Sequence, residues 1–342
     1  MRASTTLALL VGALGACMGA SMAYRAPQNG AASQAPARKA QEEIDKRTAP
    51  TLTAVRAPAD VGERAMAHAR TLTGFGPRYP GTPGWTQQLD HIQRTLEGLG
   101  LTVQRDTWTD RKERITFTNL SATIAGTKKE RIVLACHHDT KCTTGHPDPD
   151  NNFHFVGAND GASGVALLLA LAPELQARTN AATIELVFFD GEESLDWRWN
   201  DGARAMFGSK RFCKRHRDAE LLGESPRIGA LVLLDMVGRS DLHIQEELYS
   251  TPQLRQFVWS AAVATGHAAQ FFQRAEAASD DHMPFLDVGI PAVDLIDLNG
   301  NPHWHKATDT IEHLSAASLQ KVADVVLTML PAIEAAYIAR RD

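Results

Sequence analysis

Histidine and carboxylate side chains follow several apolar runs of this 342-residue chain, at the point where each run ends. Imidazole nitrogens and carboxylate oxygens are the ligands that a zinc-like ion takes in proteins. The sequence therefore predicts a metal site built from some of these residues. The sets are His137-His138-Asp139 after 132–136, Asn159-Asp160 after 153–158, Asp190-Gly191-Glu192-Glu193 after 184–189 and Asp235 after 231–234, and two later loops add Ser279-Asp280-Asp281-His282 and His303-Trp304-His305.

The apolar runs alternate with helical patterns. Runs that are β-branched or continuously apolar, as in buried strands, lie at 114–124, 131–136, 183–189, 228–234 and 291–296. Helical segments lie at 60–73, 84–99, 163–177, 203–215 and 251–265, and a last helix places Leu319, Val322, Val326, Met329, Ile333 and Tyr337 on one face. This alternation predicts an α/β fold, a three-layer α/β/α sandwich around a mostly parallel mixed sheet. Because ligand crevices of open α/β sheets lie at the carboxyl ends of the strands, the polar sets should meet there.

Each residue alone has an ordinary structural reading. The pair Glu192-Glu193 suits a helix N-terminus, Asp160 before Gly161 suits a turn, and Asp235 suits a cap. His305 alone suits a surface position. Their common position at strand ends favours a joint site, because caps need not all follow buried strands.

Several other function classes are excluded or disfavoured. The formal net charge of −5, with 35 Lys+Arg against 40 Asp+Glu, leaves no global positive field for nucleic acid. The four cysteines follow no CxxC pattern of a structural zinc site. The segment 161–164 lacks the glycine spacing of a nucleophile elbow, and the chain contains no Walker loop, HExxH or full GxGxxG.

The first residues have the pattern of an export signal. Arg2 precedes a short apolar run at 7–16, about half of what a membrane-spanning helix requires. Two cleavage sites compete: the sequence before Cys17 matches a bacterial lipobox, whereas 21–23 offers the small residues of a soluble-protein signal. We expect an export signal at 1–23, a flexible tether at 24–59 rich in Ala, Pro and Gln, and one catalytic domain at 60–342. The expected product is a monomer in the bacterial periplasm or envelope, lipid-anchored at Cys17 or secreted.

The ordered motifs resemble one family. The chain is similar to the zinc-dependent M28 peptidase clan, and within it to the glutaminyl cyclases of bacterial form. The motifs that carry the resemblance are His137-x-Asp139, Gly157-Ala-Asn-Asp160, Phe188-Phe-Asp-Gly-Glu192-Glu193, Gly208-Ser209, Leu233-Leu-Asp235, Asp280-Asp-His282, Trp304-His305 and the turn at 79–84. The resemblance implies a zinc exopeptidase-like fold.

The resemblance also implies residue roles. Asp160, Glu193 and His305 would hold one Zn²⁺ per chain, and Glu192 would act as general acid and base. Asp235 and Asp280 correspond to two buried acids that share protons with Glu192. The implied reaction converts the N-terminal glutamine of peptides or proteins to pyroglutamate and releases ammonia.

Two alternatives stay open. An M28 metallo-aminopeptidase would bind a second zinc through His137 and Asp235, and both residues are present. Cyclisation needs water kept away from the site, for which aromatic walls serve. Trp304 and either Trp197 or Trp199 supply such walls, and Asp294 stands where bacterial cyclases also carry Asp, so the cyclase is favoured. The other alternative is a noncatalytic binding domain.

Overall fold

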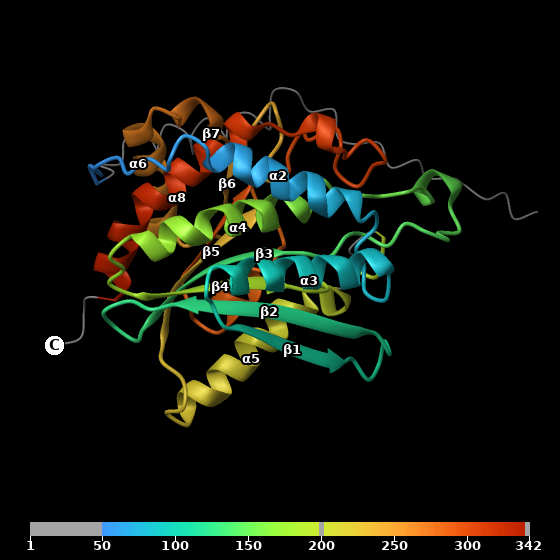
Figure 1. Cartoon of the computed structure of the whole chain (residues 1–342), viewed down its shortest axis with the longest axis horizontal. Helices are drawn as coiled ribbons and strands as arrows, with labels where there is room; N and C mark the ends of the chain where they lie inside the picture. The colour runs from blue at the N-terminus through green and yellow to red at the C-terminus, as the bar shows by residue number, and fades with distance from the viewer. Residues whose placement is uncertain (1–49, 198–201, 339–342) are drawn as a thin grey trace, which may run out of the picture.

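A six-stranded sheet in the order β1-β2-β4-β3-β5-β8 forms the central layer of the computed structural model, which describes residues 50–197 and 202–338 (Figure 1). β3, β4, β5 and β8 are parallel, whereas β2 is antiparallel to β1 and β4. The predicted α/β class with a mostly parallel mixed sheet is confirmed. The strands are β1 (Val103–Thr109), β2 (Thr116–Ile124), β3 (Arg131–His137), β4 (Thr183–Phe189), β5 (Ile228–Asp235) and β8 (Ala292–Ile296).

Helices cover both faces of this sheet. Alternate residues of β3 show the division, because Ile132 and Leu134 belong to one buried cluster and Val133 and Ala135 to another. The first cluster lies under α2 (Val61–Gly74), α3 (Pro83–Gly98), α4 (Ala162–Ala177), α6 (Pro252–Thr265) and α8 (Ala316–Tyr337). The second lies under α5 (Phe207–Leu221) and α7 (Met283–Asp287), and Figure 1 shows α5 on the side of the sheet opposite to α2 and α4. The short 3-10 turns are η1 (Pro149–Asn151), η2 (Gly202–Arg204), η3 (Ala268–Gln270) and η4 (Ile311–His313).

Three strands were absent from the sequence prediction. β1 is half-exposed and polar, which hides its period. β6 (Ile244–Glu247) and β7 (Phe271–Glu276) form a separate parallel pair. β6 reads Ile-Gln-Glu-Glu and is nonetheless fully buried, so no local hydrophobic signal marks it.

The helix predicted at 203–215 begins later than expected. Met206, which precedes α5, has a φ of 55°, in the left-handed region that few side chains adopt. This residue separates η2 from α5, and α5 then continues to Leu221.

The last part of the predicted tether lies along α8. The Val55 amide donates to Thr328 Oγ1 at 2.9 Å, and the Ala57 amide donates to Asp324 Oδ1 at 2.9 Å. The predicted export signal at 1–23 with Cys17, and the tether up to residue 49, lie outside the described residues.

The C-terminal helix α8 is long and apolar enough to cross a membrane by length and composition. However, 67% of its most apolar window is buried inside the structure. Val322, Val326, Met329 and Ile333 are fully buried in the main core, so α8 has the burial of a core helix.

Candidate active site and metal centre

The carboxyl ends of β3, β4 and β5 and the start of α4 bring the predicted residues together. Gly161, the residue before α4, has a φ of 88°. A Cβ atom there would lie 2.7 Å from the Asp139 carbonyl oxygen and 3.3 Å from His137 Cε1. Only glycine therefore lets the Asp160 turn approach the end of β3 this closely.

Asp160, Glu193 and His305 form a group that can hold a metal ion. One ligand atom from each lies within 4.8 Å of the others. His305 Nε2 is 3.2 Å from Glu193 Oε1 and 3.4 Å from Asp160 Oδ2. Asp160 Oδ2 and Glu193 Oε2 are buried without a hydrogen-bond partner. Buried carboxylate oxygens that lack a hydrogen bond and lie beside an imidazole fit a Zn²⁺ ion, which takes these donors.

The charges around this group differ from one carboxylate to the next. Burial raises the pKa of Glu193, but His305 and Lys141 outweigh it and bring that pKa to about 2. Burial and the neighbouring Glu193 raise the pKa of Asp160. Lys141 is itself buried, and its Nζ lies 3.5 Å from Glu193 Oε2. A dication would relieve the repulsion between the two carboxylates.

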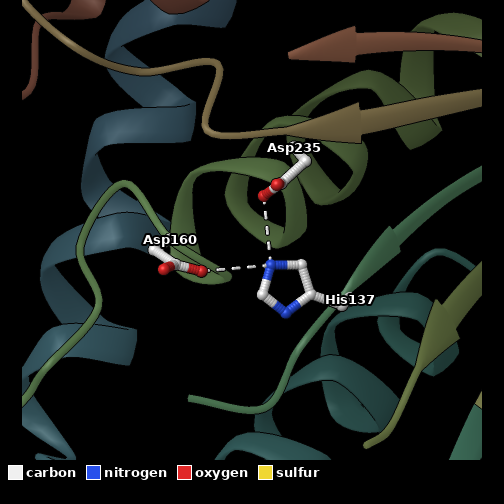
Figure 2. A group of neighbouring side chains, drawn as sticks. All are labelled: His137, Asp160 and Asp235. Carbon is white, nitrogen blue, oxygen red and sulfur yellow. Dashed lines mark hydrogen bonds and ion pairs between the residues drawn. The ribbon is translucent and has the colours of Figure 1, made fainter. Parts of the chain in front are cut away.

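A second group, His137, Asp160 and Asp235, lies beside the first and shares Asp160 (Figure 2). His137 Nε2 is 3.0 Å from Asp235 Oδ1 and 3.4 Å from Asp160 Oδ1. Burial would lower the pKa of His137, but Asp235 and its other acidic neighbours raise it well above its usual value. The pair His137 and Asp235 therefore interacts as hydrogen-bonded partners.

Two aspartates without an assigned role in the sequence prediction hold the ligand loops. Asp139 accepts the amides of Glu192 and Glu193, each at 3.2 Å. Asp309 accepts the amides of Asn159 and Asp160 at 2.8 and 3.0 Å. Asp139 lies in a motif at a strand end, whereas Asp309 has no such sequence signal, because its partners are about 150 positions away.

Glu192 lies next to the metal group with a different environment. Burial raises the pKa of Glu192 well above its usual value; His137 lowers it, and Glu193 and Asp280 raise it further. Burial and Asp235 raise the pKa of Asp280 to about 7. The raised pKa values favour the protonated forms of these acids, which can share protons with one another.

A cavity of about 300 Å³ opens onto these groups. Trp304 is 40% exposed, and its ring stacks on that of His305 at 4.3 Å. Trp197 lies 6.0 Å from the His305 ring, and Trp199 lies outside the described residues. The lining residues are Asp160, Glu192, Trp197, Asp235, Met236, Ala277, Ala278, Ser279, Asp280, Ile296, Leu298, Trp304 and His305.

Asp294, predicted as a pocket residue, is not among the lining residues. It is fully buried in β8, two positions before Ile296, which does line the cavity. Alternate residues of a strand share a face, so Asp294 lies on the same side of the sheet but one step deeper. Burial, Asp280 and Asp235 raise the pKa of Asp294 well above its usual value, so it interacts with acids that do line the cavity.

Two of the lining residues have a strained backbone. His305 has a φ of 51° and Met236 a φ of 49°. Such conformations cost about 1–3 kcal/mol each and persist where the surrounding structure imposes them.

Two cysteines lie near the end of β3, Cys136 within the strand and Cys142 after it. Both are free thiols.

Comparisons with known proteins identify the family. The model of peptidase family M28 matches residues 119–330. The glutaminyl-peptide cyclotransferase of Drosophila melanogaster is 29% identical over 280 residues, which cover 73% of this chain and 75% of the relative.

Solved structures named as glutaminyl cyclases also match this chain. The glutaminyl cyclase of an Acidobacteriales bacterium is 31% identical, with a TM-score of 0.72, and the match covers 84% of this chain and 98% of that one. The glutaminyl cyclase of Fimbriiglobus ruber is also 31% identical, with a TM-score of 0.73 and coverages of 82% and 97%.

Proposed function

The chain belongs to peptidase family M28 and, within it, to the glutaminyl cyclases, and we propose that it converts the N-terminal glutamine of peptides and proteins to pyroglutamate. The observation that carries the proposal is the cavity itself. Its lining includes an acid of raised pKa, Glu192, two members of the metal group and two tryptophan side chains, Trp197 and Trp304. This arrangement suits an intramolecular amide exchange from which water is excluded.

We propose that Asp160, Glu193 and His305 hold one zinc ion. When bound, zinc supplies a Lewis acid that polarises the γ-carbonyl of the substrate glutamine. Glu193 and His305 enter from the β4 end and the loop before α8, and Asp160 from the turn before α4. These three ligands leave a fourth position for substrate, as in catalytic zinc sites.

Glu192 moves the proton in this proposal. Its carboxylate accepts the proton of the α-amine as the bond between the α-nitrogen and the γ-carbonyl carbon forms. It then returns the proton to the departing carboxamide nitrogen, so that ammonia leaves as the old carbon–nitrogen bond breaks. Asp235 and Asp280 line the same cavity, and they orient Glu192 and share its proton.

Product analysis with metal counting tests the proposal. We expect the purified protein to convert Gln-peptides to pyroglutamyl peptides with release of ammonia and to contain one zinc per chain. His305→Ala should lose both zinc and turnover. Full zinc occupancy and turnover in this variant would refute the ligand assignment.

One observation favours a second candidate, a two-zinc aminopeptidase. His137, Asp160 and Asp235 converge closely enough to hold another ion (Figure 2). We propose the one-zinc cyclase because the relative and the two solved structures described above are named as glutaminyl cyclases. Two metals per chain and free amino acid from Leu- or Ala-peptides would establish the aminopeptidase instead. Metal without any turnover would indicate a binding domain.

We also propose that the protein is exported and that its mature chain starts at or shortly after Cys17. The apolar run at 7–16 and the lipobox-like residues before Cys17 support this proposal. Mass spectrometry of the native N-terminus is the measurement. A chain that retains Met1 in a cytosolic fraction would contradict export.

A further inference from the structure

A fully buried carboxylate, Glu247, lies outside the cavity lining and has no place in the mechanism above. Its Oε1 accepts the amides of Tyr249 and Ala278, both at 3.0 Å. Its Oε2 accepts the amide and the hydroxyl of Ser250 at 2.7 and 2.8 Å, and lies 3.1 Å from His282 Nε2. Both carboxylate oxygens of Glu247 thus face donors. Burial raises the pKa of Glu247, but His282 and the amides of Ala278 and Tyr249 outweigh it and bring that pKa to about 2.

Two of these contacts hold the two ends of one short segment. Ala278 begins the segment 278–282 and His282 ends it, and Asp280 lies between them. Ala278, Ser279 and Asp280 form one wall of the cavity. Glu247 therefore fixes, from behind, the segment that presents Asp280 to Glu192.

His282 links Glu247 to the buried acids. Both residues are fully buried, and His282 Nδ1 lies 3.8 Å from Asp294 Oδ2. The Asp294 amide donates to Ser250 Oγ at 3.0 Å, so β8 is tied to the same point. The Nε2 edge of His282 thus faces the Glu247 carboxylate, and its Nδ1 edge faces Asp294.

The acids in front of this pair repel one another. Burial and Asp280 raise the pKa of Asp294 well above its usual value. Burial and Asp235 raise that of Asp280, and His282 is the largest influence that opposes them. The Glu247 carboxylate keeps the His282 imidazole in place. The imidazole in turn stabilises Asp280 and Asp294 in one geometry.

We infer that Glu247 and His282 form a positioning pair for the reaction, which holds Asp280 and Asp294 in the geometry that orients Glu192. The inference rests on the proposed cyclase function. Among the residues that the structure describes, neither member of the pair lines the cavity or belongs to the metal group, so the pair acts through the segment 278–282.

Glu247→Gln tests the pair, because the amide keeps the size but replaces an acceptor with a donor facing Ser250 or His282. We expect kcat to fall about 10- to 100-fold, with KM and zinc content nearly unchanged, since small displacements of a catalytic group cost this much. Amide hydrogen exchange should become faster in the peptide that contains 278–282. This second readout does not depend on turnover.

Glu334→Gln is the matched control. Glu334 is a buried carboxylate that accepts the amides of Ala181 and Ala182 and pairs with Arg178, but it lies in α8. It should lower the melting temperature while leaving kcat within about twofold of wild type. If Glu247→Gln loses no more kcat than this control, or leaves exchange at 278–282 unchanged, the inference is wrong. If wild type and control themselves do not cyclise glutamine, the proposed function fails instead.

Two substitutions of His282 distinguish a positioning role of this side chain from a packing role. Glutamine places a donor near the former Nε2 and can still reach Glu247, whereas asparagine places its polar atoms nearer the former Nδ1 and cannot. We expect His282→Gln to retain at least fivefold more kcat than His282→Asn at equal zinc content. Equal losses in the two variants, in proportion to their melting temperatures, would reduce His282 to a packing residue and overturn the pair.

Discussion

Glu192 and Glu193 are neighbours in the chain, yet their surroundings give them different ionisation. Both are buried, but Glu193 faces His305 and Lys141, which bring its pKa to about 2. Glu192 keeps a pKa well above its usual value, because burial and the nearby acids outweigh His137. One residue is therefore suited to hold a cation and the other to exchange a proton.

Glu192→Gln tests this division at the residue scale. The amide is nearly isosteric but cannot take the α-amine proton, so kcat should fall about 10²- to 10⁴-fold. Zinc content and KM should change little, because Glu193, the proposed zinc ligand, is untouched. Steady-state kinetics with metal analysis is the measurement, and a variant that keeps wild-type kcat would remove Glu192 from the mechanism.

At the scale of elements, the ligands depend on turns that other segments hold. The turn before α4 carries Asp160, and Asp309, from the loop before α8, accepts its amides. Asp139, at the end of β3, does the same for the loop after β4. The metal group is thus assembled by hydrogen bonds between loops, and the sheet supplies the common edge.

Asp309→Asn should weaken zinc binding about 10- to 100-fold, as removal of a partner behind a ligand typically does. The amide turns one acceptor into a donor that faces the amide of Asn159 or Asp160. Competition with a chelator measures the affinity. Asp324→Asn is the control, because Asp324 is also buried and accepts a backbone amide, that of Ala57, but in α8. Equal zinc affinities in the two variants would contradict the role of Asp309.

At the scale of the whole molecule, acid should destabilise the fold through α2 and α3. His68 Nδ1 in α2 is 3.1 Å from His91 Nε2 in α3. Burial, then His91 and Arg64, lower the pKa of His68 from 6.5 to about 4. Between pH 4 and pH 6.5 the unfolded chain binds more protons at His68 than the folded chain does. The contribution of His68 to the free energy of unfolding is therefore fully present above pH 6.5 and is lost as pH falls toward 4.

The measurement is the free energy of unfolding in urea at pH 7.5 and pH 5. The wild type should lose about 1–2 kcal/mol more than His68→Gln over this interval, with allowance for the partial exposure of the side chain. Comparison with the variant cancels the contributions of other titrating groups. Identical losses would show that His68 does not couple folding to protons.

The sequence alone determined the α/β class and showed that histidines and carboxylates gather at one edge of the sheet. This was possible because the carboxyl ends of parallel strands share an edge, so His137, Glu193 and Asp235 are neighbours once three strands are recognised. The motifs also carried the family, which the comparisons confirm. Strands with polar or half-exposed residues, such as β1 and β6, had no comparable signal.

Only the tertiary structure decided what lies behind the ligands. Asp309 binds the amides of a turn far earlier in the chain, and Glu247 contacts Ala278 and His282 of a later segment, so no local period encodes these contacts. The depth of Asp294, one step beyond the cavity wall, follows from the pleat and the register of β8 against β5. Residue type and position after a strand are properties of the chain, whereas the hydrogen bonds that orient a carboxylate exist only once distant segments have packed against one another.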